Sequence, residues 1–151
     1  MRHKMPSFPE PTWFLALGRL MEAEGALFQR LGFAETRFVV RVMPDEGDNG
    51  GENLVGLVID GYRLSDAKLI DELEAFDPDF VICARRSVWN RMLSEIAESG
   101  RPSLRHTLSS LALMGEEMWL ESSDQLREDK FYRYNQTLQE ILNLASHLPA
   151  R

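Results

Sequence analysis

Residues 77–120 constrain the fold of this chain more than any other stretch, because their pattern predicts a strand, two helices and a second strand. Residues 80–84 (FVICA) are almost wholly apolar, which is typical of a short strand buried on both faces. Residues 116–121 (EEMWLE) indicate the second strand. The two helices must lie on the sheet that these strands join, since an amphipathic helix needs an apolar surface to cover.

Each of these two helices has a hydroxyl residue near its start and a glycine at its end. Ser87 offers a cap for the first helix, and Ser103 starts the second. Gly100 and Gly115 end them, because glycine adopts the left-handed cap conformation without a Cβ clash. The apolar residues at helical spacing are Val88, Trp89, Met92, Leu93 and Ile96 in the first helix, and Leu104, Leu108, Leu111 and Ala112 in the second.

The part of the chain before this stretch predicts a three-stranded meander. Residues 37–43 alternate between apolar and polar side chains, as on an antiparallel strand with one buried face. Residues 53–61 and 63–73 indicate the next two strands. Residues 44–52 form a polar, glycine-rich turn that lacks both the Lys-Ser/Thr ending of a phosphate loop and the closing glutamate of a calcium loop.

Long helices are expected at both ends of the chain. Apolar residues recur at helical spacing over residues 11–31 and again over residues 122–148. Residues 1–9 predict a flexible N-terminal arm, so a single domain would cover residues 10–148. Together these patterns predict an α+β domain, with a mixed, mostly antiparallel sheet of about five strands covered by helices mainly on one face.

The amino-acid composition limits the kinds of partner that we expect for this protein. The 151 residues have an apolar fraction of 44% and a formal charge of −7, which fit one soluble domain. Clustered Lys and Arg are missing, so nucleic acid is not an expected partner, and stable insertion into a membrane is not expected either. The chain shows no signal-peptide pattern and has one cysteine, so a cytoplasmic location is the expectation.

Few residues offer catalytic chemistry. Cys83 lies inside an apolar strand, which predicts a buried and unreactive thiol. His106 falls on the polar side of a short helix, and Asp60 precedes a glycine at a turn, where aspartate is common. No spacing of histidines and carboxylates fits a metal site. We therefore expect no catalytic residue, no metal and no cofactor.

A resemblance to a known family is found in two segments of the chain. These are DPDFVICARRSVWNRMLSEIAESG (residues 77–100) and TLSSLALMGEEMWL (residues 107–120). Their order of aspartate, apolar strand, aromatic residue on a helix, Leu-rich helix, glycine and strand resembles the C-terminal half of the sterol carrier protein 2 sterol-binding domain family. With the strands upstream, the resemblance covers roughly residues 10–145. The matching residues are Asp77 or Asp79, residues 80–84, Trp89, Met92, Leu93, Leu111, Gly115, Met118 and Leu120.

The resemblance implies an apolar cavity between the sheet and the two central helices. The implied function is the non-catalytic binding of a lipid-like apolar small molecule there, with transfer or presentation as further steps. Burial of apolar surface would drive uptake without a charge partner. The expected lining residues, which would otherwise simply fill the core, are Trp89, Met92, Leu93, Ile96, Leu108, Leu111, Met114, Met118 and Leu120.

Two other functions fit the same pattern of elements. A small isomerase or dehydratase with a cone-shaped sheet would need an acid or base in its cavity, and Asp60 and His106 are the candidates. An accessory domain with a filled core would use the terminal helices as a dimer surface, so a homodimer is also considered. Trp119 alternates with Met118 and Leu120, and burial under the C-terminal helix is the simplest expectation for it.

Overall fold

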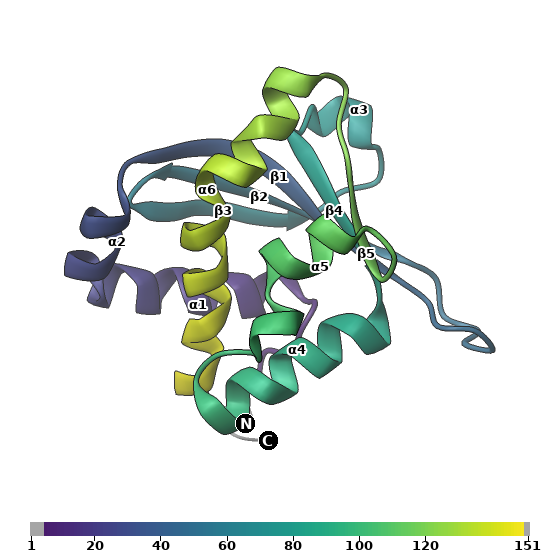
Figure 1. Ribbon diagram of the computed structural model, residues 1–151, viewed down its shortest axis with the longest axis horizontal. Coiled ribbons are helices and arrows are strands. Elements are labelled where there is room, and N and C mark those ends of the chain that lie inside the picture. Colours follow the sequence, from purple (N-terminus) through teal and green to yellow (C-terminus); the bar gives the residue numbers. More distant parts are fainter. Residues whose placement is uncertain (1–4, 150–151) are drawn as a thin grey trace.

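The computed structural model describes residues 5–149, and its centre is one mixed sheet of five strands in the order β3-β2-β1-β4-β5 (Figure 1). The strands are β1 (Ala34–Met43), β2 (Asn53–Gly61), β3 (Arg63–Leu69), β4 (Phe80–Arg85) and β5 (Met118–Glu121). β1 pairs in parallel with β4, and every other neighbouring pair is antiparallel. The α+β class and the mostly antiparallel sheet of five strands are therefore confirmed.

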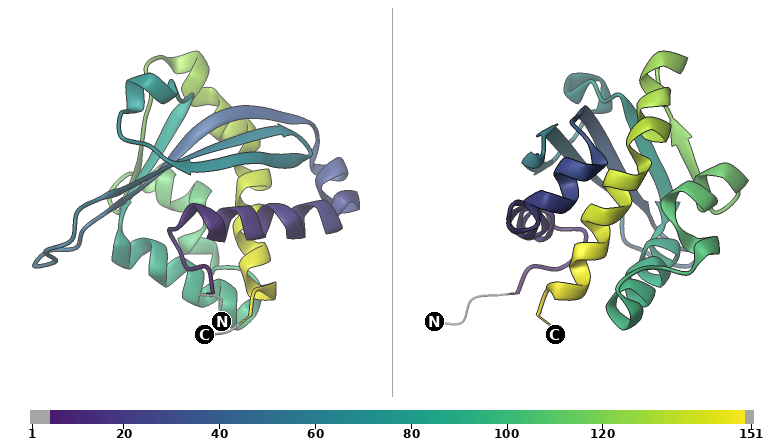
Figure 2. Two further views of the ribbon diagram at one scale, coloured as in Figure 1. Left: turned by 180° about the vertical axis from the view of Figure 1, so that it is seen from behind. Right: turned by 60° about the vertical axis from the view of Figure 1, so that its left-hand side comes forward.

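Helices cover the two faces of the sheet unequally. The helices are α1 (Pro11–Ala23), α2 (Gly25–Leu31), α3 (Leu73–Phe76), α4 (Arg86–Ser99), α5 (Leu108–Met114) and α6 (Gln125–Asn143), with the short 3-10 helices η1 (Leu104–His106) and η2 (Leu144–His147). Figure 2 shows α1, α4, α5 and α6 together on one side of the sheet. Among the described helices, only α3 contributes to the opposite face, where its Phe76 is buried against the strands.

The alternation of β1 divides the buried residues into two clusters. Phe38, Val40 and Val42 point toward α1, α4 and α6 and belong to the larger cluster. Val39 points the other way and packs with Phe76 in the smaller cluster. The predicted meander is confirmed, because β1, β2 and β3 are successive antiparallel neighbours.

The predicted helix over residues 11–31 is divided into α1 and α2 at Glu24. Glu24 has φ −103° and ψ 38°, and its N–H lies within hydrogen-bond distance of the carbonyls of both Leu20 and Met21. Gly25 follows, and glycine has a low helix propensity. The prediction of one continuous helix was therefore wrong at this break, which redirects α2 toward β1.

The predicted strand over residues 63–73 is shorter than expected and is followed by a helix that the pattern did not indicate. β3 ends at Leu69, and α3 occupies Leu73–Phe76. Gly56 on β2 leaves room for Phe76, because a Cβ at Gly56 would lie 2.8 Å from two atoms of the Phe76 ring. A strand in place of α3 would leave this position on the sheet uncovered.

The starts of the two central helices differ from the prediction. Ser87 does not cap α4, which begins at Arg86, and the Ser87 hydroxyl donates to Asp45 Oδ1 at 2.6 Å instead. The second helix becomes η1 followed by α5, and Thr107 caps α5 by accepting from the Ser110 N–H at 3.1 Å. The predicted ends at Gly100 and Gly115 are confirmed, with φ of 81° and 73°.

Part of the expected N-terminal arm packs on the domain. Phe8 places its ring 5.2 Å from that of Trp13 and 5.9 Å from those of Phe14 and Trp89. Pro9 is buried. Residues 1–4 of the expected arm lie outside the described residues.

Candidate ligand-binding site

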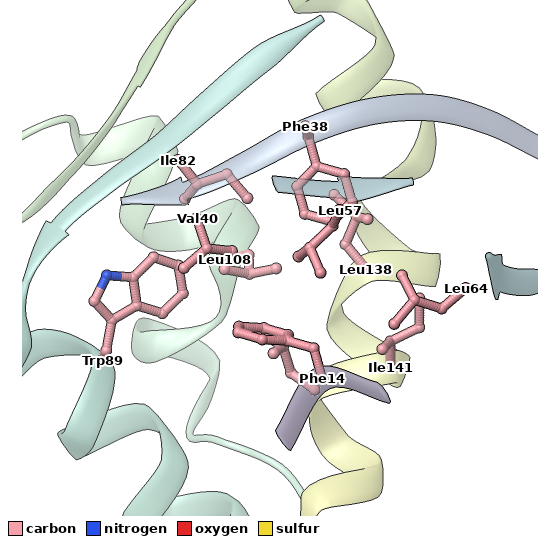
Figure 3. Close-up of a pocket in the computed structure, with 11 residues that line it drawn as sticks. Phe14, Phe38, Val40, Leu57, Leu64, Ile82, Trp89, Leu108, Leu138 and Ile141 are labelled. Atoms are coloured by element: carbon pink, nitrogen blue, oxygen red, sulfur yellow. The ribbon is translucent and has the colours of Figure 1, made fainter. Parts of the chain in front are cut away.

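A small apolar cavity lies where the helical layer meets the sheet, and its volume is about 20 Å³ (Figure 3). Four strands and four helices contribute to its wall. The lining residues are Phe14, Phe38, Val40, Leu57, Leu64, Ile82, Trp89, Leu108, Leu138, Ile141 and Leu142. No polar side chain other than the indole of Trp89 is among them, so the wall offers apolar contact alone.

Local structure explains why these side chains converge. Phe38 and Val40 are two residues apart on β1 and therefore share the face that points toward the helices. Ile82 is paired with Val40 across the parallel β1–β4 ladder. Trp89 lies in the first turn of α4, and its indole Nε1 donates to the Arg41 carbonyl at 3.2 Å. That bond satisfies the one polar atom of the indole and leaves its carbon face toward the cavity.

Phe14 supplies the wall opposite the sheet. Its ring comes from α1 and points into the same space as Trp89 and Leu57 in Figure 3. Phe8 contacts both Phe14 and Trp89 from the outer side. The N-terminal segment thus closes the aromatic wall of the cavity.

The size of the cavity determines what it holds in this state. A volume of about 20 Å³ is close to the space of one water molecule. Sites for drug-sized ligands usually have about 300–1,000 Å³. The core is therefore closed and almost filled, and a lipid-like molecule would enter only if the wall moved outward.

The nine residues expected to line a cavity fall into three groups. Trp89 and Leu108 line it. Met92, Ile96, Leu111 and Met118 are buried in the surrounding core, and Leu93 and Leu120 are partly buried against it. Met114 lies away from this cavity, because 69% of it is exposed at the end of α5. Ligand contact itself stays a prediction for all nine.

Most of the cavity wall consists of residues that the sequence patterns did not predict. The missed residues are Phe14, Phe38, Val40, Leu57, Leu64, Ile82, Leu138, Ile141 and Leu142. The alternation of residues 37–43 already placed Phe38 and Val40 on one buried face, so it could have indicated those two. The others come from elements far apart in the chain, and only the topology brings them together.

Trp119 lies on the opposite side of the sheet from its expected place. It packs beside Val81, Cys83 and Phe76 in the smaller cluster, and its Nε1 donates to Glu121 Oε2 at 3.3 Å. Burial under the C-terminal helix was therefore the wrong expectation. The physical reason is that Met118 and Leu120 occupy the helix-covered face of β5, and the alternation of a strand sends Trp119 to the other face.

The two candidate acid–base residues lie away from the cavity. His106 Nδ1 is 2.7 Å from Glu95 Oε2 and 3.1 Å from Ser103 Oγ, in the connection between α4 and α5. Asp60 is exposed near the end of β2. Neither lines the cavity, so the acid or base that the isomerase hypothesis requires is not supplied by these two residues. Within residues 5–149, no group of three or more His, Cys, Asp or Glu side chains could hold a metal ion.

A polar cluster beside the core fastens α6 to the sheet. The carboxylate of Asp79 accepts from the Thr36 hydroxyl at 2.8 Å, from Lys130 Nζ at 3.2 Å and from Arg127 Nε at 3.3 Å. Burial acts to raise the pKa of Asp79, but the hydrogen bonds from Thr36, the Arg37 N–H and Lys130 outweigh it and hold the pKa below its ordinary value. The carboxylate already binds these partners, so the cluster acts as a structural clamp.

With this geometry established, comparison with solved structures identifies the fold. The chain superposes on a crystal structure of sterol carrier protein 2 with a TM-score of 0.67 and 22% identity, covering 95% of this chain and all of the other. It also superposes on the solution structure of a conserved hypothetical protein from Thermus thermophilus, for which a sterol carrier role is suggested. That match has a TM-score of 0.65 and 21% identity, and covers 99% of this chain and 94% of the other.

The chain therefore has a sterol carrier protein 2-like fold. No protein-family model and no curated sequence matches it. None of the helices within residues 5–149 combines the length and the apolar character needed to cross a membrane.

Proposed function

We propose that this protein binds one lipid-like apolar molecule inside its core, without catalysis, for transfer or presentation to a partner. The observation that carries this proposal is the wholly apolar cavity at the centre of a sterol carrier protein 2-like fold. A ligand there gains free energy from burial at about 25 cal/mol per Å² of apolar surface and needs no ion pair. Apolar surface is therefore the one property that this site requires of its ligand.

Uptake requires the closed core to expand. Helix α5 is a short part of the helical layer, with seven residues, and contributes Leu108 to the wall. Met92 and Met118 are buried nearby, and methionine side chains adapt to irregular spaces. Outward movement of α5, together with repacking of these two side chains, would open space next to Trp89 and Phe14.

A second function is favoured by the cavity volume itself. A space of about 20 Å³ is what a filled core contains, so an accessory or dimerisation domain that has kept the fold is the alternative. Such a domain binds no lipid and uses its outer surface for a second copy of the chain. The two functions differ in whether the core admits a ligand.

The test begins with organic extraction of the freshly purified protein and mass spectrometry of any lipid that co-purifies. Displacement of a fluorescent fatty acid then measures binding in solution. A stoichiometric ligand that competes with the probe would support the proposal. A well-folded protein that carries no lipid and binds no probe would overturn it in favour of the filled core.

Two neighbouring residues of β1 provide matched variants. Val40→Phe places a larger side chain into the cavity, and Val39→Phe places the same side chain into the smaller cluster on the other face. Both changes overpack a buried site by the same volume, at a cost of about 1–3 kcal/mol. Loss of probe binding in Val40→Phe alone, with both variants folded, would locate the ligand on the helix-covered face. Equal loss in both variants would contradict that location.

A further inference from the structure

A groove of about 390 Å³ lies at the surface between the segment before α1, helix α4 and the end of the last helical turn. Its walls come from residues 6–13, 90–97 and 145–149. Figure 2 shows the segment before α1, α4 and η2 at the same end of the molecule. The core cavity of about 20 Å³ must expand to hold a ligand, whereas the volume of the groove already falls within the usual range of about 300–1,000 Å³ for ligand sites.

The groove differs from other surface hollows of similar size in the charge of its wall. Three hollows of about 290, 330 and 450 Å³ each include at least four charged side chains. None of the ten described residues that line the groove is charged, and all of them except Asn90 and Ser146 are apolar or aromatic. Such a wall can bind the apolar part of a ligand through burial alone.

One polar group in this wall lacks a partner among the described residues. Trp13 is 6% exposed, and its indole N–H donates to no described residue. The other two tryptophans are satisfied. The indole of Trp89 donates to the Arg41 carbonyl at 3.2 Å, and that of Trp119 donates to Glu121 Oε2 at 3.3 Å. A mostly buried donor without a partner is costly, and an acceptor on a ligand would remove that cost.

The Trp13 nitrogen is open to this groove. Within residues 5–149, the one fully buried side-chain nitrogen or oxygen without a partner is Arg91 Nε. Trp13 Nε1 therefore lies in the small exposed part of its side chain, and the groove is the hollow that Trp13 lines. An indole N–H can only donate, so it selects a ligand atom that accepts, such as an oxygen. Asn90, exposed on the α4 wall, offers a second polar group to the same ligand.

We propose that this groove binds an amphiphile with a single alkyl chain that ends in an alcohol or carbonyl oxygen. The chain lies along the apolar wall, and the oxygen accepts a hydrogen bond from the Trp13 indole N–H. The ring of Phe8 lines the groove and lies 5.9 Å from the rings of Phe14 and Trp89, which line the core cavity. Phe8 thus separates the two spaces, so the groove is a second site and the inference goes beyond the binding proposed for the core.

The test is a titration of the ¹⁵N-labelled full chain with decan-1-ol, followed by two-dimensional NMR. The three tryptophans give three indole N–H peaks, which single Trp→Phe variants assign. The Trp13 peak should shift and saturate, whereas the Trp119 peak, on the other face of the sheet, should stay in place. Octan-1-ol should bind about tenfold more weakly than decan-1-ol, because a shorter chain buries less apolar surface.

Two exposed positions of α4 provide matched variants. Ala97 lines the groove and Ser99 does not. Ala97→Phe should therefore abolish binding of decan-1-ol, and Ser99→Phe should leave it unchanged. Trp13→Phe keeps an aromatic ring but removes the donor, so it should weaken binding about fivefold. The backbone amide peaks of Asn90 and Ala97 measure the affinity of the Trp13→Phe variant.

A Trp13 peak that shows no saturable shift, or equal affinities of Ala97→Phe and the wild type, would overturn the proposal. Trp13→Phe that binds as tightly as the wild type would overturn the proposed hydrogen bond. A shift of the Trp89 peak without one of the Trp13 peak would place the alcohol in the core cavity, which would support the proposed function and overturn this second site. Failure of the fatty-acid probe to enter the core would leave the Trp13 readout unchanged, so the two proposals fail separately.

Discussion

The thiol of Cys83 is fully buried on β4, in the smaller cluster between the sheet and α3. Burial raises its pKa to about 12, with Glu121 adding to the rise and Arg41 opposing it. The predicted burial of this cysteine is confirmed. Because the thiolate is the reactive species, the folded protein holds the thiol in its inert form at every physiological pH.

We expect Cys83 to resist thiol reagents in the native state. At pH 8 an aromatic disulfide reagent should react with it at less than about one-hundredth of the rate of a free thiol, and should react fully once denaturant is added. The measurement is the absorbance of the released thiolate over time. Labelling of the native protein as fast as of the unfolded chain would show that the smaller cluster opens readily.

The ionisation of the Asp79 side chain affects the stability of the fold. Its side chain is 9% exposed and binds both Lys130 and Arg127. Its pKa in the folded state lies below the unfolded value, which is about 3.9. The carboxylate therefore contributes stability that is present above a pH of about 3.9 and is lost as the pH falls through the lower, folded pKa.

Asp79→Asn should lower the free energy of unfolding by about 2–3 kcal/mol at pH 7, because it leaves Lys130 and Arg127 without their shared partner. The difference from the wild type should shrink as the pH falls below about 4, where the wild-type carboxylate also becomes neutral. Urea unfolding at a series of pH values measures this. Asp77→Asn is the control, since Asp77 pairs with the same Arg127 but is largely exposed, and its effect should be much smaller.

At the scale of elements, α5 depends on its cap. The Thr107 hydroxyl accepts from the Ser110 N–H, and Gln139 Oε1 on α6 accepts from the Leu108 N–H at 2.7 Å. A helix of seven residues is too short to be stable alone. These two bonds and the burial of Leu108 and Leu111 therefore carry most of its stability.

Thr107→Ala should destabilise α5 by about 1 kcal/mol, which corresponds to about fivefold faster exchange of its amide hydrogens. The amides of β1 and β4 should be unaffected, because the rest of the core does not use this cap. Hydrogen exchange followed by mass spectrometry measures both. Ser109→Ala, at an exposed position of the same helix, should leave the exchange of α5 unchanged. Equal acceleration in the two variants would contradict a capping role.

Sequence patterns predicted those elements whose periodicity is long or whose ends are marked by glycine. The apolar run of β4, the stops at Gly100 and Gly115, and the alternation of β1 belong to this group. Helix α3 has only four residues, which is too short for apolar residues to recur at helical spacing. The break at Glu24 depends on how α2 leads into β1. The cavity wall was hardest to predict, because it joins residues as distant as Phe14 and Leu142.

At the scale of the whole molecule, the two faces of the sheet have different roles. The face under α1, α4, α5 and α6 holds the large cluster and the cavity, whereas the opposite face holds a small cluster under α3. Under the proposed function, a ligand would reach the cavity by displacing part of this helical layer. Of that layer, α5 is a helix of seven residues and contributes Leu108 to the cavity wall.

The proposed ligand should stabilise the whole domain, because it binds the folded state alone. At a ligand concentration of about 100 times Kd, linkage adds about 2.7 kcal/mol to the free energy of unfolding. For a domain of 151 residues this raises Tm by roughly 5–10 °C. Differential scanning fluorimetry with an unlabelled fatty acid measures the shift, and Val40→Phe should abolish it while Val39→Phe keeps it. A Tm that stays constant at every ligand concentration, in a protein freed of bound lipid, would mean that the core is filled and that its outer surface carries the function.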